Sequence, residues 1–251
     1  MSSQQVAIIT GGSRGLGAEI ALSVAKRGVD VIVTFVANEE AANATVAKIQ
    51  ALGRKAAALK LDVAAVSSFF SFVASVKTTL ATFGTDRFSF LVNNGGFGGY
   101  NPIAATTEEN FDALFNAHIK GPYFLTQKLL PLLLDGGCVL NITTGLTRFS
   151  MVGYAPYAAA KSALETFTRY LAQELGPRRI RGVALAPGAI ATDFGGGHVR
   201  DNATVNAMIA GQTPLGRVGE SEDIGKAAAA ILLDLTWVNA QRIEASGGIH
   251  P

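Results

Sequence analysis

The stretch from Val6 to Gly17 decides the fold and reads VAIITGGSRGLG. Residues 6–9 are apolar and suit a short buried strand, and apolar residues recur at helical spacing from Leu16 onward. The turn between them carries glycines at 11, 15 and 17, in the pattern G-x-x-x-G-x-G. Glycines let a backbone approach phosphate closely, and a helix N-terminus supplies N–H groups. This order predicts the first unit of a dinucleotide-binding fold, with a ligand-free tight turn as the alternative.

The rest of the chain repeats the alternation of strand and helix. Further strands are expected over 31–35, 56–61, 88–92, 138–142, 183–186 and 241–244. Helices are expected over 38–52, 67–83, 107–134, 156–175 and 221–233, with Asn38 and Ser221 as candidate N-caps. The long segment 107–134 should bend or break around Gly121-Pro122 and Pro131. We therefore predict an α/β fold of the doubly wound Rossmann type, a seven-stranded parallel sheet with helices on both faces.

Composition bounds the function. Of 251 residues 49% are hydrophobic and only 16% are charged, which excludes a disordered chain or a coiled coil. The net charge of +2 does not suggest nucleic acid as a partner. One cysteine and three scattered histidines exclude a disulfide framework and indicate no metal.

No linker or change of composition divides the chain, so residues 1–251 are expected to form a single dinucleotide-binding and catalytic domain. The polar, uncharged segment Met1 to Gln5 does not resemble a targeting signal, and no stretch approaches the ~20 apolar residues of a membrane span. We expect a cytoplasmic protein without a membrane partner. The glycine-rich stretch 192–215 is weakly periodic and is the best candidate for a mobile lid.

A tyrosine and a lysine stand four residues apart in YAAAK, residues 157–161. On a helix Tyr157 and Lys161 would share a face. A free tyrosine titrates near pH ~10, and a nearby ammonium lowers that pKa by favouring the phenolate. Tyr157 is therefore a candidate general acid for carbonyl reduction, with an ordinary solvated contact as the alternative.

Four motifs in this order resemble the classical short-chain dehydrogenase/reductase family, over nearly the whole chain. They are TGGSRGLG at 10–17, NNGG at 93–96 where the family usually has N-N-A-G, YAAAK at 157–161 and PGAIAT at 187–192. The likeness to bacterial 3-oxoacyl-acyl-carrier-protein reductases extends to PLGR at 214–217. Binding at the carboxyl ends of the strands is also what an open α/β sheet predicts.

The resemblance implies catalytic roles for Asn116, Thr144, Tyr157 and Lys161. The family places a serine thirteen residues before the tyrosine, where it polarises the substrate carbonyl. Here Thr144 keeps the hydroxyl but adds a methyl, so the pocket should be more crowded; Thr143 could substitute only if the loop shifts. Asn116 would position a water in the proton relay, whereas His118 is expected to be a packing or surface residue.

The residues at the end of the second predicted strand indicate whether the protein binds NAD or NADP. Enzymes that use NAD place a carboxylate there, but Phe35 occupies that position. Arg14 is the nearby cation, which predicts NADP(H) with Arg14 on the 2′-phosphate; the alternative is a solvated surface arginine. The resemblance implies that Lys161 binds the nicotinamide ribose, that Asn93 and Gly95 flank the ribose, and that Asp62 accepts from the adenine amine. The expected cofactor-binding residues are Gly11, Ser13, Arg14, Gly15, Leu16, Gly17, Thr34, Asn38, Asp62, Val63, Asn93, Gly95, Tyr157, Lys161, Pro187, Gly188, Ile190 and Thr192.

The candidate substrate pocket is mostly apolar and aromatic, which suits a hydrophobic ketone. Its expected residues are Phe97, Tyr100, Leu146, Phe149, Met151, Val152, Tyr154, Phe194 and Met208. We therefore predict an NADPH-dependent carbonyl reductase that makes a secondary alcohol, with a small-molecule ketone or alcohol as substrate.

Three other functions stay open. A 3-oxoacyl-acyl-carrier-protein reductase needs a basic entrance, for which Arg148 and Arg200 are the candidates. A non-catalytic NADP sensor would be expected to lack the tyrosine or the lysine. A mainly oxidative alcohol dehydrogenase is disfavoured by the missing carboxylate. The resemblance also implies a homotetramer, with Trp237-Val238 and residues 246–251 in the C-terminal region that often packs between subunits.

Overall fold

The computed structural model describes residues 4–250, so Pro251 and the first three residues of the segment Met1–Gln5 lie outside it. One parallel sheet contains all seven strands in the order β3-β2-β1-β4-β5-β6-β7. The strands are β1 (Val6–Ile9), β2 (Asp30–Phe35), β3 (Ala56–Lys60), β4 (Phe88–Asn93), β5 (Leu133–Ile142), β6 (Arg181–Pro187) and β7 (Arg242–Ala245). Because the chain turns from one half of the sheet to the other between β1 and β4, the switch point lies there, and the predicted Rossmann-type fold is confirmed.

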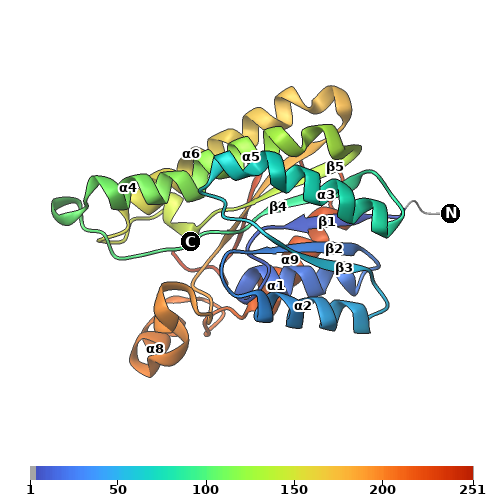
Figure 1. Ribbon diagram of the computed structural model, residues 1–251. Helices are drawn as coiled ribbons and strands as arrows, with labels where there is room; N and C mark the ends of the chain where they lie inside the picture. The colour runs from blue at the N-terminus through green and yellow to red at the C-terminus, as the bar shows by residue number, and fades with distance from the viewer. Residues whose placement is uncertain (1–3, 251) are drawn as a thin grey trace.

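Helices cover both faces of the sheet (Figure 1). One face carries α1 (Gly15–Ala25), α2 (Glu39–Ala51) and α9 (Ser221–Leu233). The other carries α3 (Phe69–Phe83), α4 (Glu108–Phe115), α5 (Gly121–Leu129) and α6 (Ala155–Glu174). The short α7 (His198–Asp201) and α8 (Ala203–Gln212) follow β6, and α8 projects beyond the end of the sheet (Figure 1).

The alternation of side chains along β1 explains the two-sided core. Ala7 and Ile9 pack into the cluster under α1 and α9, whereas Val6 and Ile8 pack into the cluster under α3 and α5. All four side chains are fully buried. A strand that is apolar on both faces belongs in the middle of a parallel sheet, which is where β1 lies.

The segment predicted as one helix over 107–134 is divided differently. A π-helical turn, Asn116–Lys120, separates α4 from α5, with Gly121 N–H bonded to the Asn116 carbonyl five residues before it. The helical part ends at Leu132, because Pro131 lies in a short 3₁₀ turn, and β5 begins at Leu133 rather than at residue 138.

Two N-caps were expected and one is confirmed. The Asn38 side chain accepts a hydrogen bond from the first turn of α2, as expected. Ser221 does not cap α9; the cap is Glu220, which forms a reciprocal capping box with Asp223. A carboxylate there accepts the first-turn N–H as a serine hydroxyl would, so the sequence pattern misplaced the cap by one residue.

One helical segment, Val66–Phe83, is long and apolar enough to cross a membrane by length and composition alone. It contains α3, whose side chains Phe69, Phe72, Val76 and Leu80 are buried in the core against the sheet. Only 33% of this window is buried, so one face packs on the sheet and the rest is exposed, and length and composition alone are weak evidence of a membrane span.

Candidate active site

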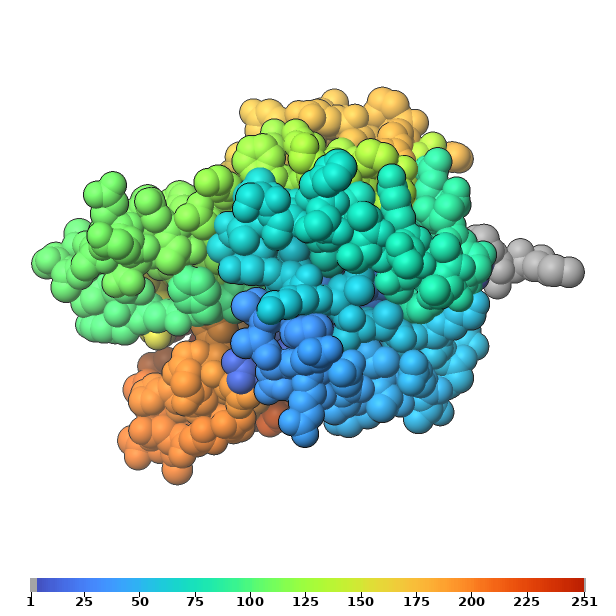
Figure 2. All heavy atoms as spheres, in the orientation of Figure 1, coloured from blue at the N-terminus to red at the C-terminus, as the bar shows by residue number. Residues whose placement is uncertain are grey.

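The candidate site lies at the carboxyl ends of the strands, at the edge of the sheet from which α4 and α8 project (Figure 1). Figure 2 shows a hollow between the green segment around α4 and the orange segment around α8. The turns after β1, β4, β5 and β6 all reach this edge. Polar side chains carried by these separate turns are therefore brought together.

The glycine turn after β1 is shaped for phosphate. Arg14 precedes α1 in an extended conformation and no side chain caps the helix, whose first turn carries no acidic residue. The first N–H groups of α1 are therefore left for a ligand, and the helix dipole favours an anion. A Cβ at Gly17 would collide with the carbonyl oxygen of Gly11, so only glycine allows this tight packing. Ser13, Gly15 and Leu16 belong to the same turn, which fits a dinucleotide pyrophosphate.

Side chains from neighbouring strands hold the glycine turn in place. The Thr10 hydroxyl accepts hydrogen bonds from the N–H groups of Asn94 and Gly95, and the Asn94 amide donates to the Thr10 carbonyl at 2.9 Å. The Thr34 hydroxyl accepts from Gly11 N–H at 3.2 Å and is 1% exposed. Thr34 thus supports the turn from beneath, and Asn94, which the sequence interpretation did not assign, ties the ends of β1 and β4 together.

Asn93, expected beside the cofactor ribose, points its side chain into the core. Its amide donates to Asn141 Oδ1 at 2.8 Å and to the Thr126 hydroxyl at 3.2 Å. The Asn141 amide in turn donates to the Thr168 hydroxyl at 2.8 Å. This buried chain joins β4, β5, α5 and α6, so the Asn93 side chain fixes the sheet under the site.

The residues expected to bind the adenine end of the cofactor lie at the outer edge of the candidate site. Phe35 is buried at the end of β2, so no carboxylate projects from that position. The Arg14 guanidinium is exposed and lies 3.8 Å from the Asp193 carboxylate. The Asn38 oxygen is used to cap α2, which leaves its amide N–H groups as donors. Asp62 is exposed and accepts a hydrogen bond from its own loop.

The loop after β6 runs back toward the glycine turn. Pro187 ends β6 and is buried, and Ile190 pairs with Gly219 through an isolated bridge. Thr192 is buried, and its hydroxyl accepts a hydrogen bond from Phe194 N–H at 3.2 Å. The region predicted as a lid therefore starts from a fixed point and continues into α7 and α8.

Tyr157 and Lys161 face the site from the first turns of α6. Both are buried, and the Lys161 ammonium donates to the Ile142 carbonyl at 2.7 Å. The Lys161 nitrogen lies 5.9 Å from the centre of the Tyr157 ring. Their spacing of four residues on a helix does place them on one face, as the sequence predicted.

The expected effect of this lysine on the tyrosine is wrong for this structure. Burial raises the pKa of Tyr157, and the Thr144 hydroxyl only partly offsets it. Burial also lowers the pKa of Lys161 to about 7. Burial is the largest cause of both pKa shifts, and Lys161 is not among the causes for Tyr157. The spacing in the sequence predicts proximity but not burial. Tyr157 therefore stays protonated near neutral pH, as a proton donor must.

Thr144, not Thr143, presents its hydroxyl at the site. Thr143 is 3% exposed, and its hydroxyl donates to the Leu185 carbonyl in β6 at 3.4 Å. Thr144 is half-buried and accepts a hydrogen bond from Leu146 N–H at 3.3 Å. The loop therefore needs no shift for Thr144 to take the position of the family serine.

An ion-pair network that the sequence did not indicate holds the Thr144 loop. Arg242 in β7 donates to the Thr144 carbonyl at 3.1 Å and to Glu165 of α6 at 2.8 Å. It also donates to Glu244 at 2.7 Å, and Glu244 accepts from Arg148 at 2.9 Å. The network joins α6, β7 and the loop after β5, so Arg242 positions the segment that carries Thr144.

Asn116 and His118 occupy the π-helical turn, but they lie differently. Asn116 is half-buried, and its side chain makes no hydrogen bond within residues 4–250. His118 is 1% exposed, and its ring stands edge-on to the Tyr157 ring with centres 5.1 Å apart. His118, which was expected to be a packing or surface residue, is therefore in contact with Tyr157, the candidate acid.

Among the expected pocket residues, Phe194 contacts Tyr157, and the other aromatic side chains pair with their own neighbours. The Phe194 ring centre lies 6.0 Å from that of Tyr157, and a Cβ at Gly98 would collide with the Phe194 ring. Tyr154 precedes α6 and meets Tyr100 edge-on at 6.4 Å. Phe97 lies 5.8 Å from the His118 ring.

The remaining expected pocket residues are more scattered. Phe149 packs at 4.4 Å against His250 near the C-terminus instead of against Tyr157. Leu146 is half-buried, whereas Met151, Val152 and Met208 are exposed. Within residues 4–250, no group of three His, Cys, Asp or Glu side chains could hold a metal ion.

A Rossmann-type sheet, an uncapped glycine turn and a buried Tyr–Lys pair at the strand ends together define a dinucleotide-dependent oxidoreductase. The family model described as enoyl-(acyl carrier protein) reductase matches residues 11–250. The chain belongs to the short-chain dehydrogenase/reductase family, as its motifs had indicated.

Relatives and solved structures cover nearly the whole chain. An uncharacterized oxidoreductase of Methylorubrum extorquens is 36% identical over 98% of this chain and 98% of its own. A tetrahydroxynaphthalene reductase of Pestalotiopsis fici is 34% identical over 97% of this chain and 91% of its own. The crystal structure of the angucycline C-6 ketoreductase LanV with bound NADP has a TM-score of 0.92 at 28% identity, covering 98% of this chain and 95% of that one.

Proposed function

We propose that the protein is an NADPH-dependent carbonyl reductase that converts a hydrophobic ketone to a secondary alcohol, with Tyr157 as the general acid. The observation that carries the proposal is the convergence of Thr144, Tyr157 and Lys161 at the strand ends beside the glycine turn. Tyr157 and Lys161 share a face of α6, and the fold brings Thr144, which follows β5, to this pair.

The cofactor is NADP(H). The uncapped end of α1 would hold the pyrophosphate, and Arg14 would bind the 2′-phosphate in place of its 3.8 Å contact with Asp193. The buried Phe35 at the end of β2 supports this choice, because no carboxylate repels the phosphate there. Bound NADPH supplies the hydride for reduction of the carbonyl carbon.

The chain's own residues supply position and a proton. Thr144 donates a hydrogen bond to the substrate carbonyl oxygen and orients it toward Tyr157. Tyr157, kept protonated by burial, which raises its pKa, donates its proton to the alkoxide oxygen formed at that carbonyl. Lys161, with a pKa lowered to about 7, is able to take up and release a proton near neutral pH.

The surroundings of Tyr157 favour a planar aromatic ketone. The Phe194 and His118 rings contact the Tyr157 ring, and Phe97 in turn packs against His118. Aromatic pairs gain energy beyond burial, so a fused-ring substrate would bind better than an aliphatic one of equal size. The tetrahydroxynaphthalene reductase and the angucycline ketoreductase among the similar proteins support this class.

A reductase of carrier-bound 3-oxoacyl groups is the second candidate; the family model's description shares the carrier-bound substrate with it but names an enoyl group, not a 3-oxoacyl group. It would need free positive charge at the entrance. Arg148 is paired with Glu244 at 2.9 Å, and Arg200 with Asp193 and Asp201. Both arginines are largely neutralised by these partners, which weakens this candidate.

A homotetramer in the cytoplasm remains a prediction. Tyr123 of α5 packs at 4.7 Å against Phe167 of α6, and the neighbouring Tyr170 is exposed. Such an exposed aromatic face on paired helices would suit contact with a second copy. Native mass spectrometry would give the number of subunits.

The test is the consumption of NADPH and of NADH with fused-ring ketones, aliphatic ketones and a 3-oxoacyl thioester. We expect turnover of fused-ring ketones with NADPH preferred over NADH by at least about tenfold. Turnover of the thioester alone would favour the second candidate. Tight NADPH binding without turnover of any substrate would point to a dinucleotide sensor.

A further inference from the structure

The segment that follows β7 lies against the loop that carries Thr144. Arg148, in that loop, donates a hydrogen bond to the Ile249 carbonyl at 3.0 Å. The next side chain, Phe149, packs on the His250 ring with ring centres 4.4 Å apart. Two adjacent residues of the loop are therefore in contact with two adjacent residues that lie 101 positions later in the chain.

The segment after β7 is itself fixed to the body of the protein. Ile249 is only 5% exposed, and its N–H donates to the Ser246 carbonyl at 3.3 Å. The Gly247 carbonyl accepts a hydrogen bond from the Leu215 N–H at 3.2 Å. Because the segment is anchored by these contacts, it can restrain the loop that carries Thr144 instead of moving with it.

The Phe149 ring carries one contact to the peptide next to Thr144. A Cβ at Gly145 would collide with the Phe149 ring, so glycine at 145 lets the ring lie directly on the backbone of the loop. The Phe149 N–H also donates to the Gly145 carbonyl at 3.3 Å. The rings of His250 and Phe149 thus form a series of contacts that ends on the residue after Thr144.

A chain of ion pairs carries the second contact to the Thr144 carbonyl. Arg148 donates two hydrogen bonds to Glu244, at 2.9 and 3.0 Å, and Glu244 accepts from Arg242 at 2.7 Å. Arg242 in turn donates to the Thr144 carbonyl at 3.1 Å. The hydrogen bond from Arg148 is the main cause that lowers the pKa of Glu244 to about 2, so this carboxylate stays charged at neutral pH. A guanidinium has five N–H donors in a fixed fork, so Arg148 can bind Glu244 and Ile249 together.

The direction of the Thr144 hydroxyl depends on how its backbone is held. Threonine is stiff at χ1, so its hydroxyl follows the position of the main chain. That hydroxyl accepts from the Leu146 N–H at 3.3 Å, which leaves its own hydrogen free to donate to a substrate carbonyl. A misplacement of only ~1 Å in a positioned group can cost ~10²-fold in rate, so a loosened loop would slow the reaction.

We propose that Ile249 and His250 are positioning residues for the Thr144 hydroxyl. They hold the loop through Arg148 and Phe149, so that the hydroxyl keeps its direction toward the reacting carbonyl. The sequence suggested a pocket residue in Phe149 and an entrance residue in Arg148, and the contacts give both a different task. The inference rests on the proposed reductase function, because it is the ketone substrate that uses this hydroxyl.

Loss of either contact should lower kcat for the fused-ring ketone tetralone with NADPH. Arg148→Met keeps an apolar stem and loses the hydrogen bonds to Ile249 and Glu244, so we expect kcat to fall about five- to tenfold, with NADPH binding within about twofold. His250→Ala removes the ring against Phe149 and should lower kcat about threefold. His250→Phe restores a ring there and should recover most of that loss.

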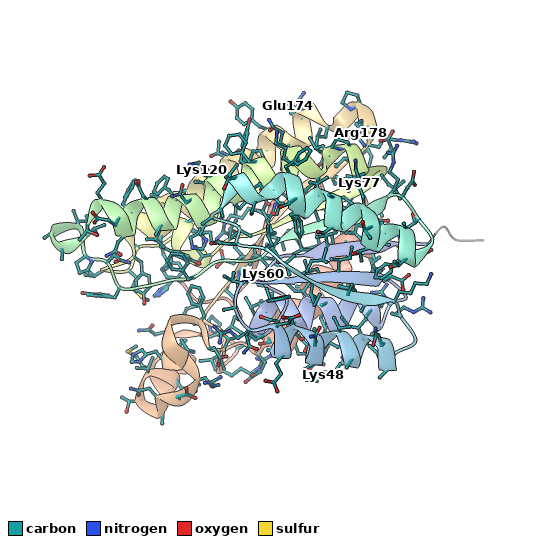
Figure 3. All side chains as sticks on the ribbon, in the orientation of Figure 1. Lys48, Lys60, Lys77, Lys120, Glu174 and Arg178 are labelled. Atoms are coloured by element: carbon teal, nitrogen blue, oxygen red, sulfur yellow. The ribbon has the colours of Figure 1, made fainter. Side chains whose placement is uncertain are left out.

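Arg178→Met is the matched control. Arg178 is paired with Asp135 at 2.8 Å and donates to the Leu130 carbonyl at 3.1 Å, so it makes the same kinds of hydrogen bond as Arg148. It ends the short 3₁₀ turn before β6, at the edge of the sheet opposite the candidate site (Figure 3). Its replacement should leave kcat within about twofold, even if the fold loses stability.

A double-mutant cycle with Thr144→Val tests whether the effect acts through the hydroxyl. Valine keeps the branched shape of threonine and removes the oxygen, so the rate no longer depends on the direction of that oxygen. Arg148→Met should then cost less than about twofold in kcat when it is added to Thr144→Val. An equal loss in both backgrounds would mean that Arg148 acts on the fold in general, and the proposal would be overturned.

Hydrogen exchange read by mass spectrometry follows the loop itself and does not depend on activity. Exchange over residues 144–149 should be faster in Arg148→Met and His250→Ala than in the wild-type protein, and unchanged in Arg178→Met. Unchanged exchange over 144–149 in the first two variants would overturn the proposal. If exchange changed as expected but the wild-type protein reduced no ketone, the proposed function would fail while the restraint of the loop would stand.

Discussion

Replacing Tyr157 by phenylalanine removes one oxygen and little else. The ring keeps its edge contact with His118 and its contact with Phe194 at 6.0 Å. The same burial that raises the pKa of Tyr157 leaves its hydroxyl poorly solvated. Because removing that hydroxyl forfeits little hydration, we expect Tyr157→Phe to keep the stability of the fold. Any large loss of rate can then be attributed to the missing proton donor.

The size of that loss follows from the burial of the site. A positioned general acid contributes typically ~10²–10⁴ in rate, or about 3–5 kcal/mol of barrier. Tyr157 is only 6% exposed, so bulk water cannot easily replace its hydroxyl, and we expect a loss toward the upper end. Thr144 would remain to bind the carbonyl, so KM should change little.

The assay is steady-state NADPH oxidation, with NADPH binding followed separately by its fluorescence. Tyr170→Phe is the matched control, since it removes an exposed hydroxyl elsewhere on α6 and is expected to leave kcat within about threefold. NADPH binding to Tyr157→Phe should remain detectable. If Tyr157→Phe retained kcat within about threefold of wild type, the assignment of Tyr157 as the acid would be refuted.

Three further outcomes are expected. Gly17→Ala should weaken NADPH binding at least about tenfold in a fluorescence titration, because its Cβ would strike the backbone of the turn, whereas Gly211→Ala, with open space around it, should not. Arg242→Met should lower kcat and cost about 1–3 kcal/mol in a urea unfolding measurement, because it frees the Thr144 loop. For Lys161, burial lowers the pKa from 10.5 to about 7, so between these pH values the unfolded chain binds the extra proton. Stability should therefore rise from pH 7 to pH ~10 by a few kcal/mol at most, and Lys161→Met should remove this dependence; an unchanged slope in the variant would contradict it.

Most of the sheet could be predicted because its signals are local. Short apolar runs identified the strands, and a glycine turn also marked the end of β1; the burial of β1 on both faces agrees with its apolar composition. The start of β5 was missed because Leu133 follows Pro131 inside an apolar run that has no period of its own. The glycine turn and the Tyr157–Lys161 pair were found for the same local reason.

What the sequence could not show depends on burial and on contacts across the chain. The direction of the Tyr157 pKa shift is set by desolvation, which spacing does not reveal. Arg242 reaches Thr144 from β7, almost a hundred residues away, and no local pattern links them. The contact of His118 with Tyr157 was not predicted, because a π-helical turn has no sequence signature. Gly96, which makes room for the His118 ring, could be interpreted only after the contact was known.

The π-helical turn sets the rotational register between two helices. A π turn holds more residues than an α turn, so the chain between α4 and α5 carries about one residue beyond what a continuous α-helix would need. If every residue stayed in one continuous α-helix, α4 would be turned by about 100° about its axis relative to α5, whereas deleting Ile119 would allow that helix with both faces kept. The phase of α4 against the sheet thus depends on the π turn, which takes up the one surplus residue.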